Sequence, residues 1–565
     1  MFETVIRGAT VVDGSGGPAF AADVGIWEGR IGAIRRLALA ADVRGAPDRL
    51  TETRVRDGCE GLAEPQLVRE PVGLAGAQLI DGGGLVLAPG FIDIHNHSDL
   101  TLLVAPRAES MICQGVTTVV VGNCGFSPAP WPGVAGGAPA LAMQEDATFL
   151  ACGMDVRWEW RSFAEYLAAL EAARPAVNVV ALVGHAAIRE QVLGRDTRAP
   201  DEVEMRRMRA LVEQALADGA AGMSSGLIYY PSCYATTAEL VALAAVVARA
   251  GRIYASHIRG EGETLLEAIS EAIEIARRTG ASSQVSHLKA ESRIMWGKLP
   301  EALALIDAAR REGHAVGCDQ YPYAAYNTSL GSFLPPEVMA GDWRGVLKSE
   351  SGRRAIRQAM FEGLPAWTSS VRGMEWTDFV IDGTDDPARD GRDLGTLAAA
   401  GGRDPYDCLF DLLLECGPHV RVIGYAMSEA DVERGVARPD VMVGSDGFAL
   451  PLEGDVGGRF PHPRSFGTFP RVVGHYCRDR GLLSLEAAVH RMTGLPAGKL
   501  SLRDRGLVRE GYRADLVLFD PRHIRDTASF ARPKVRPVGI SWVFVSGRPA
   551  LTPDGWGERA GQVIR

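Results

Sequence analysis

The sequence predicts an α/β fold in which a (β/α)8 barrel of the TIM type is joined to a small β-sandwich domain formed from both termini. Three observations lead to this prediction. Strand-like and helix-like segments alternate from about residue 84 to 500, both ends of the chain carry short strand-like runs with glycine turns, and polar side chains recur where strand-like runs end. A chain of 565 residues is also long enough to hold more than one structural unit.

The two ends of the chain have the same β-type texture. Short runs of β-branched and other apolar residues occur at 4–6, 9–12, 24–31, 514–520 and 540–547. Neither end can bury a hydrophobic face alone, so we expect the two ends to pair. This prediction assigns residues 1–83 and 501–565 to the small β domain.

The barrel is expected over residues 84–500, and its elements can be placed from periodicity. Runs such as 117–121, 177–183 and 253–255 are typical of buried strands, while 202–217 and 264–278 carry apolar residues near helical spacing.

Two stretches interrupt this order. Residues 36–78 mix charge, proline and glycine without a period, which predicts an inserted loop. Residues at about 340–440 add helical and polar sequence before the last barrel strand, and we interpret them as an insertion that could cap the barrel mouth.

The composition and charge of the chain argue against some functions and locations. The net charge of −10 and the pI of about 5.7 give no electrostatic support for binding nucleic acid. No apolar run is long enough to span a bilayer, and the first residues lack a basic stretch followed by an apolar one. Nine scattered cysteines fit a reducing compartment, so we expect a cytoplasmic protein that acts on a small molecule.

His95 and His97 are the first candidate metal ligands. They follow an apolar strand-like run, and residues i and i+2 of a strand point to the same face. Imidazole is the commonest metal ligand in proteins, although two histidines at this spacing can equally be a packed pair.

Further candidate ligands stand at the ends of later strand-like runs: Cys124, His257, His287 and Asp446. Each has an ordinary explanation when taken alone, because a buried cysteine, a packed histidine or an aspartate in a Ser-Asp-Gly turn is common. At successive strand ends they would converge at one barrel mouth. Imidazole, thiolate and carboxylate together make a suitable zinc set.

The chain resembles the metal-dependent amidohydrolase superfamily and, within it, the D-aminoacylases (N-acyl-D-amino-acid deacylases), over nearly its whole length. The residues that carry the resemblance are 89–97, 122–125, 222–229, 286–289, 321–323, 445–447 and 462–464. Its sharpest marker is Cys124 in Gly-Asn-Cys-Gly, because this branch uses a cysteine where related barrels use a carboxylated lysine.

The resemblance implies a zinc enzyme that hydrolyses N-acyl-D-amino acids. Cys124, His257 and His287 would hold a tightly bound zinc ion, and His95, His97 and Asp446 would line a second, weaker position. Zinc lowers the pKa of bound water to near neutrality. Asp446 would accept the water proton and then pass it to the leaving amine.

Substrate contacts are expected from four further side chains. Lys289, Tyr321 and Arg464 are candidates for binding the substrate carboxylate, and Tyr229 for stabilising the developing oxyanion. Each of them can instead have a packing or surface role. Asn327 departs from the family pattern, which has a small hydroxyl residue there, and the departure bears on which substrate is taken.

Two other functions stay open from the sequence. One is a different amidohydrolase reaction on a small amide, a cyclic amide or a peptide, since fold alone does not fix function. The other is a non-catalytic barrel kept as a scaffold, which we expect to have lost metal ligands. The number of metal ions, the acyl and side-chain preference and the oligomeric state are not predicted.

Overall fold

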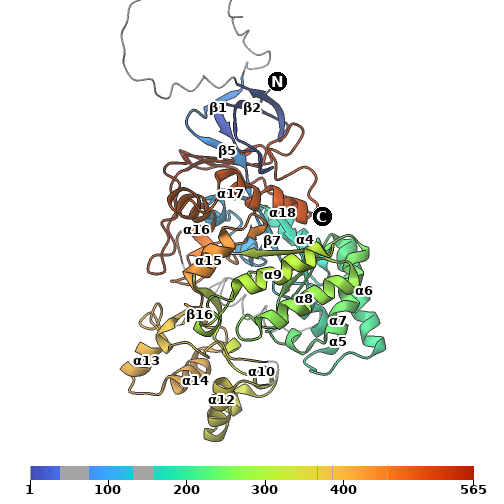
Figure 1. Ribbon diagram of the computed structural model, residues 1–565, viewed down its shortest axis with the longest axis vertical. Helices are drawn as coiled ribbons and strands as arrows, with labels where there is room; N and C mark the ends of the chain where they lie inside the picture. The colour runs from blue at the N-terminus through green and yellow to red at the C-terminus, as the bar shows by residue number, and fades with distance from the viewer. Residues whose placement is uncertain (1, 38–75, 132–157, 365–366, 385, 455) are drawn as a thin grey trace, which may run out of the picture.

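A computed structural model describes residues 2–37, 76–131, 158–364, 367–384, 386–454 and 456–565. Figure 1 shows the N-terminal strands at one end of the molecule, strands wrapped by helices in the middle, and a further group of helices at the opposite end. Most of the predicted loop at 36–78 lies outside the described residues.

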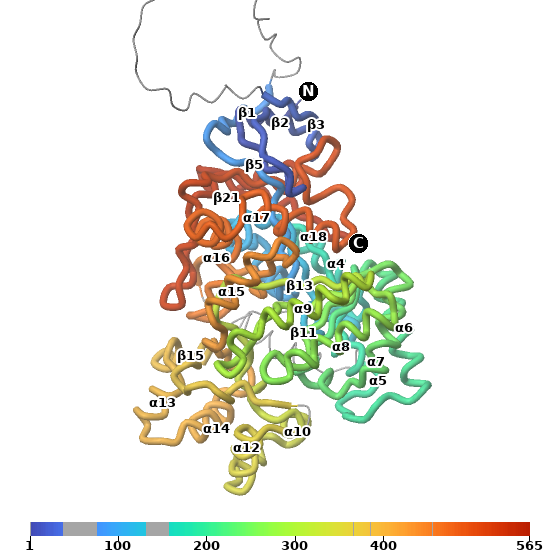
Figure 2. The backbone as a smooth tube through the Cα atoms, viewed as in Figure 1, coloured from blue at the N-terminus to red at the C-terminus, as the bar shows by residue number. Residues whose placement is uncertain are grey.

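Strands from both ends of the chain form one nine-stranded sheet, in the order β21-β20-β19-β18-β5-β1-β2-β3, with β4 paired to β1. The two ends meet where β5 pairs antiparallel with β18, Leu516 opposite Pro89. Figure 2 shows the blue N-terminal strands next to part of the red C-terminal segment. The strands are β1 (Thr4–Val11), β2 (Phe20–Trp27), β3 (Arg30–Arg36), β4 (Gln78–Asp81), β5 (Val86–Pro89), β18 (Leu516–Phe519), β19 (Ile540–Val545), β20 (Arg548–Thr552) and β21 (Gly555–Trp556).

The middle of the molecule is an α/β structure with parallel sheets, as predicted. One sheet has six strands in the order β17-β13-β12-β11-β10-β9, and the other has four in the order β22-β8-β7-β6. Every strand pair in both sheets is parallel. The strands are β6 (Phe91–Asp93), β7 (Val116–Val121), β8 (Asn178–Ala181), β9 (Val183–Gly184), β10 (Gly222–Gly226), β11 (Ile253–His257), β12 (Ser282–Val285), β13 (Val316–Gln320), β17 (Val441–Val443) and β22 (Val563–Ile564).

The two parallel sheets approach each other at two places. Strands β8 and β9 are separated only by Leu182, whose N–H donates to the carbonyl of Val121 at 2.9 Å. At the second place, Asn96, which follows β6, forms a parallel bridge with Gly447, which follows β17. The second contact links the segment after the first strand of the series to the segment after the last.

Both faces of the parallel strands are buried, as expected for sheets of this kind. One face contributes to a cluster that includes Ile92, Val120, Val180, Ala255 and Met442. The other face packs against helices, which bury apolar stripes. The helices are α1 (Thr101–Val104), α2 (Glu109–Ile112), α4 (Phe163–Ala173), α5 (His185–Leu193), α6 (Glu202–Asp218), α7 (Thr237–Arg249), α8 (Leu265–Thr279), α9 (Leu299–Arg311), α15 (Glu429–Val436), α16 (Arg464–Arg471), α17 (Leu485–Met492) and α18 (Gly494–Lys499).

An inserted unit lies between β13 and β17 and is built around a three-stranded antiparallel sheet in the order β14-β16-β15. It has its own hydrophobic cluster, which includes Phe333, Phe379, Phe410 and Val422. In Figure 1 its helices lie at the end of the molecule opposite the terminal strands. Its elements are β14 (Tyr326–Ser329), α10 (Pro336–Ala340), α11 (Trp343–Lys348), α12 (Glu350–Glu362), β15 (Phe379–Asp382), α13 (Leu394–Ala400), α14 (Pro405–Cys416) and β16 (Arg421–Gly424).

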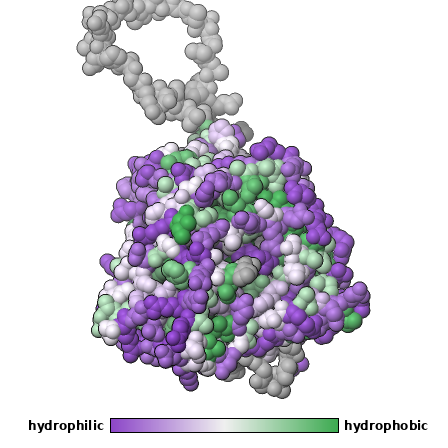
Figure 3. Space-filling view, turned by 60° about the horizontal axis from the view of Figure 1, so that its bottom comes forward, coloured by the Kyte–Doolittle hydropathy of each residue, from purple (hydrophilic) through white to green (hydrophobic). Residues whose placement is uncertain are grey.

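The outer surface is mixed in polarity. On the face shown in Figure 3, hydrophobic residues are interspersed among hydrophilic ones, which is ordinary for a surface in contact with water. Among the described residues, none of the helices combines the length and the apolar character needed to cross a bilayer.

Candidate metal centre

All the predicted metal ligands lie at the carboxyl ends of the parallel strands. His95 and His97 follow β6, and Cys124 follows β7. His257 is the last residue of β11, His287 follows β12, and Asp446 follows β17. Since the carboxyl ends of parallel strands meet at one edge, the side chains are brought together there.

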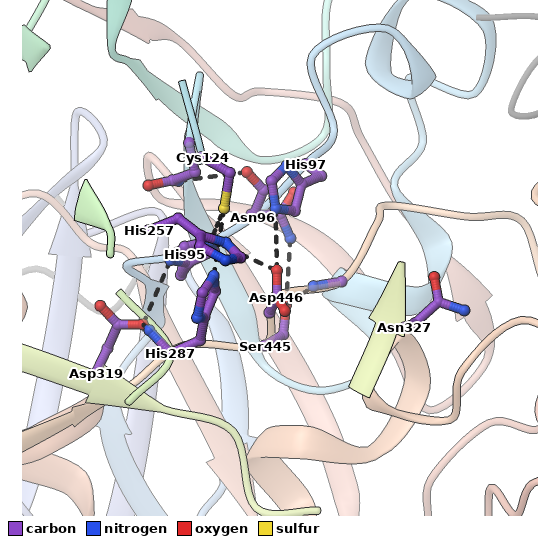
Figure 4. A network of polar contacts seen from close by, with 12 residues as sticks. His95, Asn96, His97, Cys124, His257, His287, Asp319, Asn327, Ser445 and Asp446 are labelled. Atoms are coloured by element: carbon purple, nitrogen blue, oxygen red, sulfur yellow. Dashed lines mark hydrogen bonds and ion pairs between the residues drawn. The ribbon is translucent and has the colours of Figure 1, made fainter. Parts of the chain in front are cut away.

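The distances between the side chains are short. Cys124 Sγ lies 3.3 Å from His95 Nε2 and 3.4 Å from His287 Nε2. Asp446 Oδ1 lies 3.0 Å from His97 Nε2 and 3.5 Å from His95 Nε2. Figure 4 shows these side chains pointing toward one another, with His257 beside them.

One ligand atom from each of His95, Cys124, His287 and Asp446 lies within 4.8 Å of the others, and all four residues are buried. A second group within the same limit joins His257 and His287 to Glu261. The two groups share His287, so the described residues offer two adjoining positions for a cation.

His257 gives a direct test of whether the site suits a metal ion. Its side chain is buried, neither ring nitrogen makes a well-formed hydrogen bond with the described residues, and Nε2 lies 3.6 Å from Glu261 Oε2. Burying an imidazole without such partners is costly, and coordination would satisfy one nitrogen. The donor set of imidazole nitrogens, one thiol sulfur and carboxylate oxygens fits zinc.

The backbone is strained at three of the candidate ligands. Cys124, His287 and Asp446 have φ angles of 52°, 34° and 51°, in the left-handed region that residues other than glycine rarely occupy. Strain of this kind persists where the surroundings enforce it and is concentrated at functional sites. Gly122 supports the turn before Cys124, because a Cβ there would lie 2.0 Å from the carbonyl oxygen of Leu182.

The charges of the neighbouring side chains favour the ionised forms of Cys124 and Asp446. Burial raises the pKa of the Cys124 thiol, but the neighbouring charges of His95 and His287 outweigh it and hold that pKa well below its usual value. Burial likewise raises the pKa of Asp446, and the charges of Arg464 and His287 reverse the shift, leaving the pKa well below its usual range. A thiolate and a carboxylate among imidazoles form a pronounced cation site.

Glu261 is a residue of the site that the sequence reasoning missed. Its Oε1 accepts a hydrogen bond from Lys289 Nζ at 2.5 Å and lies 2.9 Å from His287 Nδ1. Lys289 Nζ is also 2.8 Å from His287 Nδ1. Lys289 therefore lies at the site as expected, but its ammonium group is already engaged by a carboxylate. Glu261 follows His257 by four residues in a loop, where no strand-end pattern marks it.

Asp319 was also missed, although it lies near the end of the buried strand β13. Its Oδ1 accepts a hydrogen bond from the backbone N–H of His287 at 2.8 Å and lies 3.4 Å from His95 Nδ1. Its Oδ2 accepts from Gln284 Nε2 at 2.7 Å. The sequence did contain a signal for Asp319, because it is an acidic residue in a buried strand that is next to strands ending in other candidate ligands. Asp319 orients two candidate ligands without belonging to either ligand group.

Arg464 lies against Asp446, and the ring of Tyr321 lies against Arg464. Arg464 Nη1 is 2.7 Å from Asp446 Oδ2, and the guanidinium carbon is 4.9 Å from the Tyr321 ring centroid. Tyr229 lies beside His257, with its ring centroid 5.0 Å from that of His257 and its hydroxyl oxygen 3.3 Å from Thr328 Oγ1. Arg464, Tyr321 and Tyr229, which were all predicted to contact substrate, therefore lie next to the ligand cluster.

Asn327 lies on β14 of the inserted unit, and Figure 4 shows it apart from the labelled candidate ligands. Its Oδ1 accepts hydrogen bonds from Arg421 Nε at 3.0 Å and Nη2 at 2.5 Å. Arg421 was not predicted, because it stands in an apolar strand-like run without a motif.

A cavity of about 210 Å³ connects these residues. Its lining includes every predicted site residue except His95, which is buried beneath it: His97, Cys124, Tyr229, His257, His287, Lys289, Tyr321, Asn327, Asp446 and Arg464. The inserted unit and Glu291 complete the wall. Burial, with the nearby charge of Glu261, raises the pKa of Glu291 to about 7.

Comparisons with known proteins agree with this geometry. A family model described as "Amidohydrolase family" matches residues 78–322 and 362–550. D-aminoacylase of Alcaligenes xylosoxydans xylosoxydans is 36% identical, over 100% of this chain and 97% of that protein. N-acyl-D-aspartate deacylase of the same organism is 35% identical, over 99% and 94%. The crystal structure of N-acyl-D-glutamate deacylase from Bordetella bronchiseptica, with zinc and a phosphonate mimic of the tetrahedral intermediate, has a TM-score of 0.77 at 34% identity and covers 100% of both chains.

Proposed function

The chain belongs to the amidohydrolase family, and from this premise we propose that it hydrolyses the amide bond of N-acyl-D-amino acids to a carboxylate and a free D-amino acid. It would thus be a metal-dependent hydrolase of C–N bonds other than peptide bonds. The observation that carries the proposal is the convergence of Cys124, the strand-end histidines and Asp446 at the base of one cavity.

We propose zinc as the cofactor. Cys124, His257 and His287 would hold one ion tightly, and His95, His97 and Asp446 would line a second, weaker position. The ring nitrogens of His257, which make no well-formed hydrogen bond with the described residues, and the mixed sulfur, nitrogen and oxygen donors support this assignment. Bound zinc supplies a nucleophilic water at neutral pH and polarises the amide carbonyl.

The residues of the chain would then position the substrate and move protons. Asp446 is suited to accept the proton of water and deliver it to the leaving amine, because Arg464 holds its Oδ2 while Oδ1 faces the histidines. Arg464, Tyr321 and Lys289 border the place where the substrate carboxylate would lie. Tyr229, beside His257, is suited to donate to the developing oxyanion.

We also propose that the parallel strands close into a (β/α)8 barrel over residues 84–500, with the insertion at about 340–440 and the small β domain over 1–83 and 501–565. The separation of β8 from β9 by the single residue Leu182 and the bridge from Asn96 to Gly447 support closure. A cytoplasmic location is supported by the cysteines, since those within the described ranges form no disulfide with one another.

The test combines metal content with turnover. Purified protein would be assayed for zinc and for release of free amino acid from N-acetyl-D- and N-acetyl-L-amino acids, with hydantoins and dipeptides as competing substrate classes. We expect about one tightly bound zinc ion per chain and turnover that is selective for the D-substrates. Asp446→Ala should abolish this turnover, and Cys124→Ala should abolish both the turnover and zinc binding. Zinc-loaded protein that opens hydantoins but leaves every N-acyl-D-amino acid intact would contradict the proposal.

A further inference from the structure

We infer that Glu291 forms a subsite for the side chain of the substrate and selects N-acyl-D-amino acids whose side chain is positively charged, such as N-acyl-D-lysine and N-acyl-D-arginine. The inference rests on the proposed function and names the substrate class of the same site. Glu291 lines the cavity, its Oε1 is buried, and that oxygen makes no well-formed hydrogen bond with the described residues.

Glu291 differs from the other acidic residues of the cavity lining in its pairing. Each of the others forms an ion pair with a cation that also lines the cavity. These pairs are Asp446 with Arg464 at 2.7 Å, Glu261 with Lys289 at 2.5 Å, and Glu263 with Arg372 at 3.2 Å. Glu291 forms no such pair within the described parts of the chain. Because a carboxylate away from bulk water is costly without a cation, a positively charged ligand group would complete the pairing.

The charges around Glu291 do not compensate for its burial. Burial and then the charge of Glu261 raise the pKa of the Glu291 carboxyl to about 7, and the charge of Lys289 lowers it only in part. The ammonium group of Lys289 is bound by Glu261 instead. A ligand cation beside Glu291 would favour the ionised carboxyl, and by linkage the ionised carboxyl favours the cation.

The backbone holds Glu291 between the loop after β11 and the inserted unit. The N–H of Glu291 donates to the carbonyl of Glu261 at 2.8 Å. The next residue, Ser292, donates through Oγ to the carbonyl of Arg372 at 2.7 Å and has a φ of 78°, which residues other than glycine rarely adopt. Such a conformation persists where the surroundings enforce it, so the Glu291 carboxyl is presented from a fixed backbone.

The side chains around the carboxyl group suit an organic cation. The hydroxyl groups of Ser370 and Tyr326 lie next to it, and Tyr321 lies within range of its charge. All of them line the cavity. Tyrosine rings attract ammonium and guanidinium groups. A metal ion is less suited, because Glu291 belongs to neither group of candidate ligands and a hard cation needs several oxygens.

Glu291 lies where the amino-acid part of the substrate would extend. Lys289 and Tyr321, which we propose as partners of the substrate carboxylate, both lie within range of the Glu291 charge. Lys289 Nζ is 5.7 Å from the Tyr321 ring centroid. The substrate side chain leaves from the carbon that carries the carboxylate, whereas the acyl carbonyl would face Tyr229. The cation is therefore expected on the amino-acid side chain and not on the acyl group.

The experiment compares charged substrates with neutral ones of similar shape. On zinc-loaded, full-length protein, at a pH above the pKa of Glu291, kcat/KM would be measured for Nα-acetyl-D-arginine against Nα-acetyl-D-citrulline, and for Nα-acetyl-D-lysine against N-acetyl-D-norleucine. We expect the charged member of each pair to be preferred by roughly 10- to 100-fold, the usual range for a hydrogen bond to a charged group. This comparison needs no variant, so misfolding cannot obscure it.

Variants then assign the preference to Glu291. Glu291→Gln should abolish the preference in both pairs, because the amide keeps the size of the side chain and loses its charge, and Glu291→Asp should keep part of it. The ratio within each pair is the readout, so a uniform change in turnover does not mimic the result. Glu263→Gln is the matched control, because Glu263 also lines the cavity but pairs with Arg372, and it should keep the preference.

Several outcomes would overturn the inference. Wild-type protein that turns over both pairs without preferring the charged member refutes this inference alone. An equal loss on charged and neutral substrates in Glu291→Gln gives Glu291 a structural role. A preference for glycyl-D-norleucine over N-acetyl-D-norleucine that Glu291→Gln removes would place the cation on the acyl group instead. Absence of turnover of any N-acyl-D-amino acid refutes the proposed function, and this inference falls with it.

Discussion

Glu261 is the residue that links the ligands to their surroundings. It lies between His287 and Lys289, with its Oε1 within 2.9 Å of a nitrogen of each. A carboxylate that contacts the far nitrogen of a ligand imidazole fixes the orientation and the tautomer of the ring. Glu261 also balances the charge of Lys289, which would otherwise repel a cation held nearby.

We therefore predict that Glu261→Gln weakens zinc binding by roughly 10- to 100-fold, as loss of such outer contacts usually does. Competition with a metal-buffering chelator measures the affinity. Glu263→Gln is the matched control, because Glu263 is two residues away and pairs with Arg372 instead. Equal zinc affinity in Glu261→Gln and in the wild type would refute this positioning role.

The buried carboxyl group of Glu291 should make the stability of the folded protein depend on pH. Burial and then the charge of Glu261 raise its pKa to about 7, against 4.5 in the unfolded chain. Because the folded-state pKa is the higher of the two, the folded protein binds this proton more tightly. The stabilisation is complete below pH 4.5 and is lost as the pH rises through about 7.

The expected result is that Glu291→Gln, which cannot ionise, melts at a higher temperature than the wild type at pH 8. The two melting temperatures should converge toward pH 5, and saturating zinc in both samples keeps metal loading equal. A constant difference between the two proteins over this range would show that Glu291 does not titrate as described.

At the residue scale, the sequence was sufficient to predict the candidate ligands that share one pattern, a polar residue at the end of a buried apolar run. His95, His97, Cys124, His257, His287 and Asp446 all end buried apolar runs, and parallel strands bring such ends together. Glu261 and Arg421 could not be predicted in this way. Their places depend on a loop and on the register of β14 with β16, which are set by tertiary packing.

At the scale of elements, a buried polar network ties α5 to α7. His185 lies 2.8 Å from Ser232 Oγ through Nδ1 and 3.0 Å from Glu239 Oε1 through Nε2. Arg189 Nη1 donates to both oxygens of Glu239, at 2.7 and 2.6 Å. The network holds the segment that follows Tyr229, so its integrity bears on the cavity wall.

Removing the charge of Glu239 should therefore destabilise the fold. Glu239→Gln leaves the Arg189 guanidinium buried beside a neutral group, and we expect the free energy of unfolding to fall by about 3 kcal/mol, as for other broken buried pairs. Thermal melting with bound zinc measures the change. Glu213→Gln is the control, since its exposed pair with Arg249 across α6 and α7 should contribute nothing measurable. Similar melting of both variants would argue against the network.

The alternation of strands and helices was predictable because its periodicity is local. The inserted unit was harder to predict, since its sheet pairs β14 with β16 across almost a hundred intervening residues of mostly helical sequence. Its first strand begins at Tyr326, before the expected start of the insertion at about 340. That strand carries Asn327, so the unit supplies part of the cavity wall.

At the scale of the whole molecule, metal binding should be coupled to stability. The ligands come from β6, β7, β11, β12 and β17 and are assembled only when these strands pair, so an ion bound there stabilises the folded state. We predict that removing zinc with a chelator lowers the melting temperature of the wild type, by an amount that grows with the zinc concentration used as reference. Cys124→Ala should show a much smaller change, and an equal change in both would place the stabilising ion elsewhere.

The terminal sheet also has a consequence for biosynthesis. Strand β5 leaves the ribosome early, whereas its partner β18 begins at Leu516, more than four hundred residues later. Until then one side of β5 is an open edge of the sheet, and such edges invite pairing with other chains. A nascent chain stalled before Leu516 would therefore be prone to aggregation even with every ligand of the metal centre already translated, and we expect such chains to depend on chaperones.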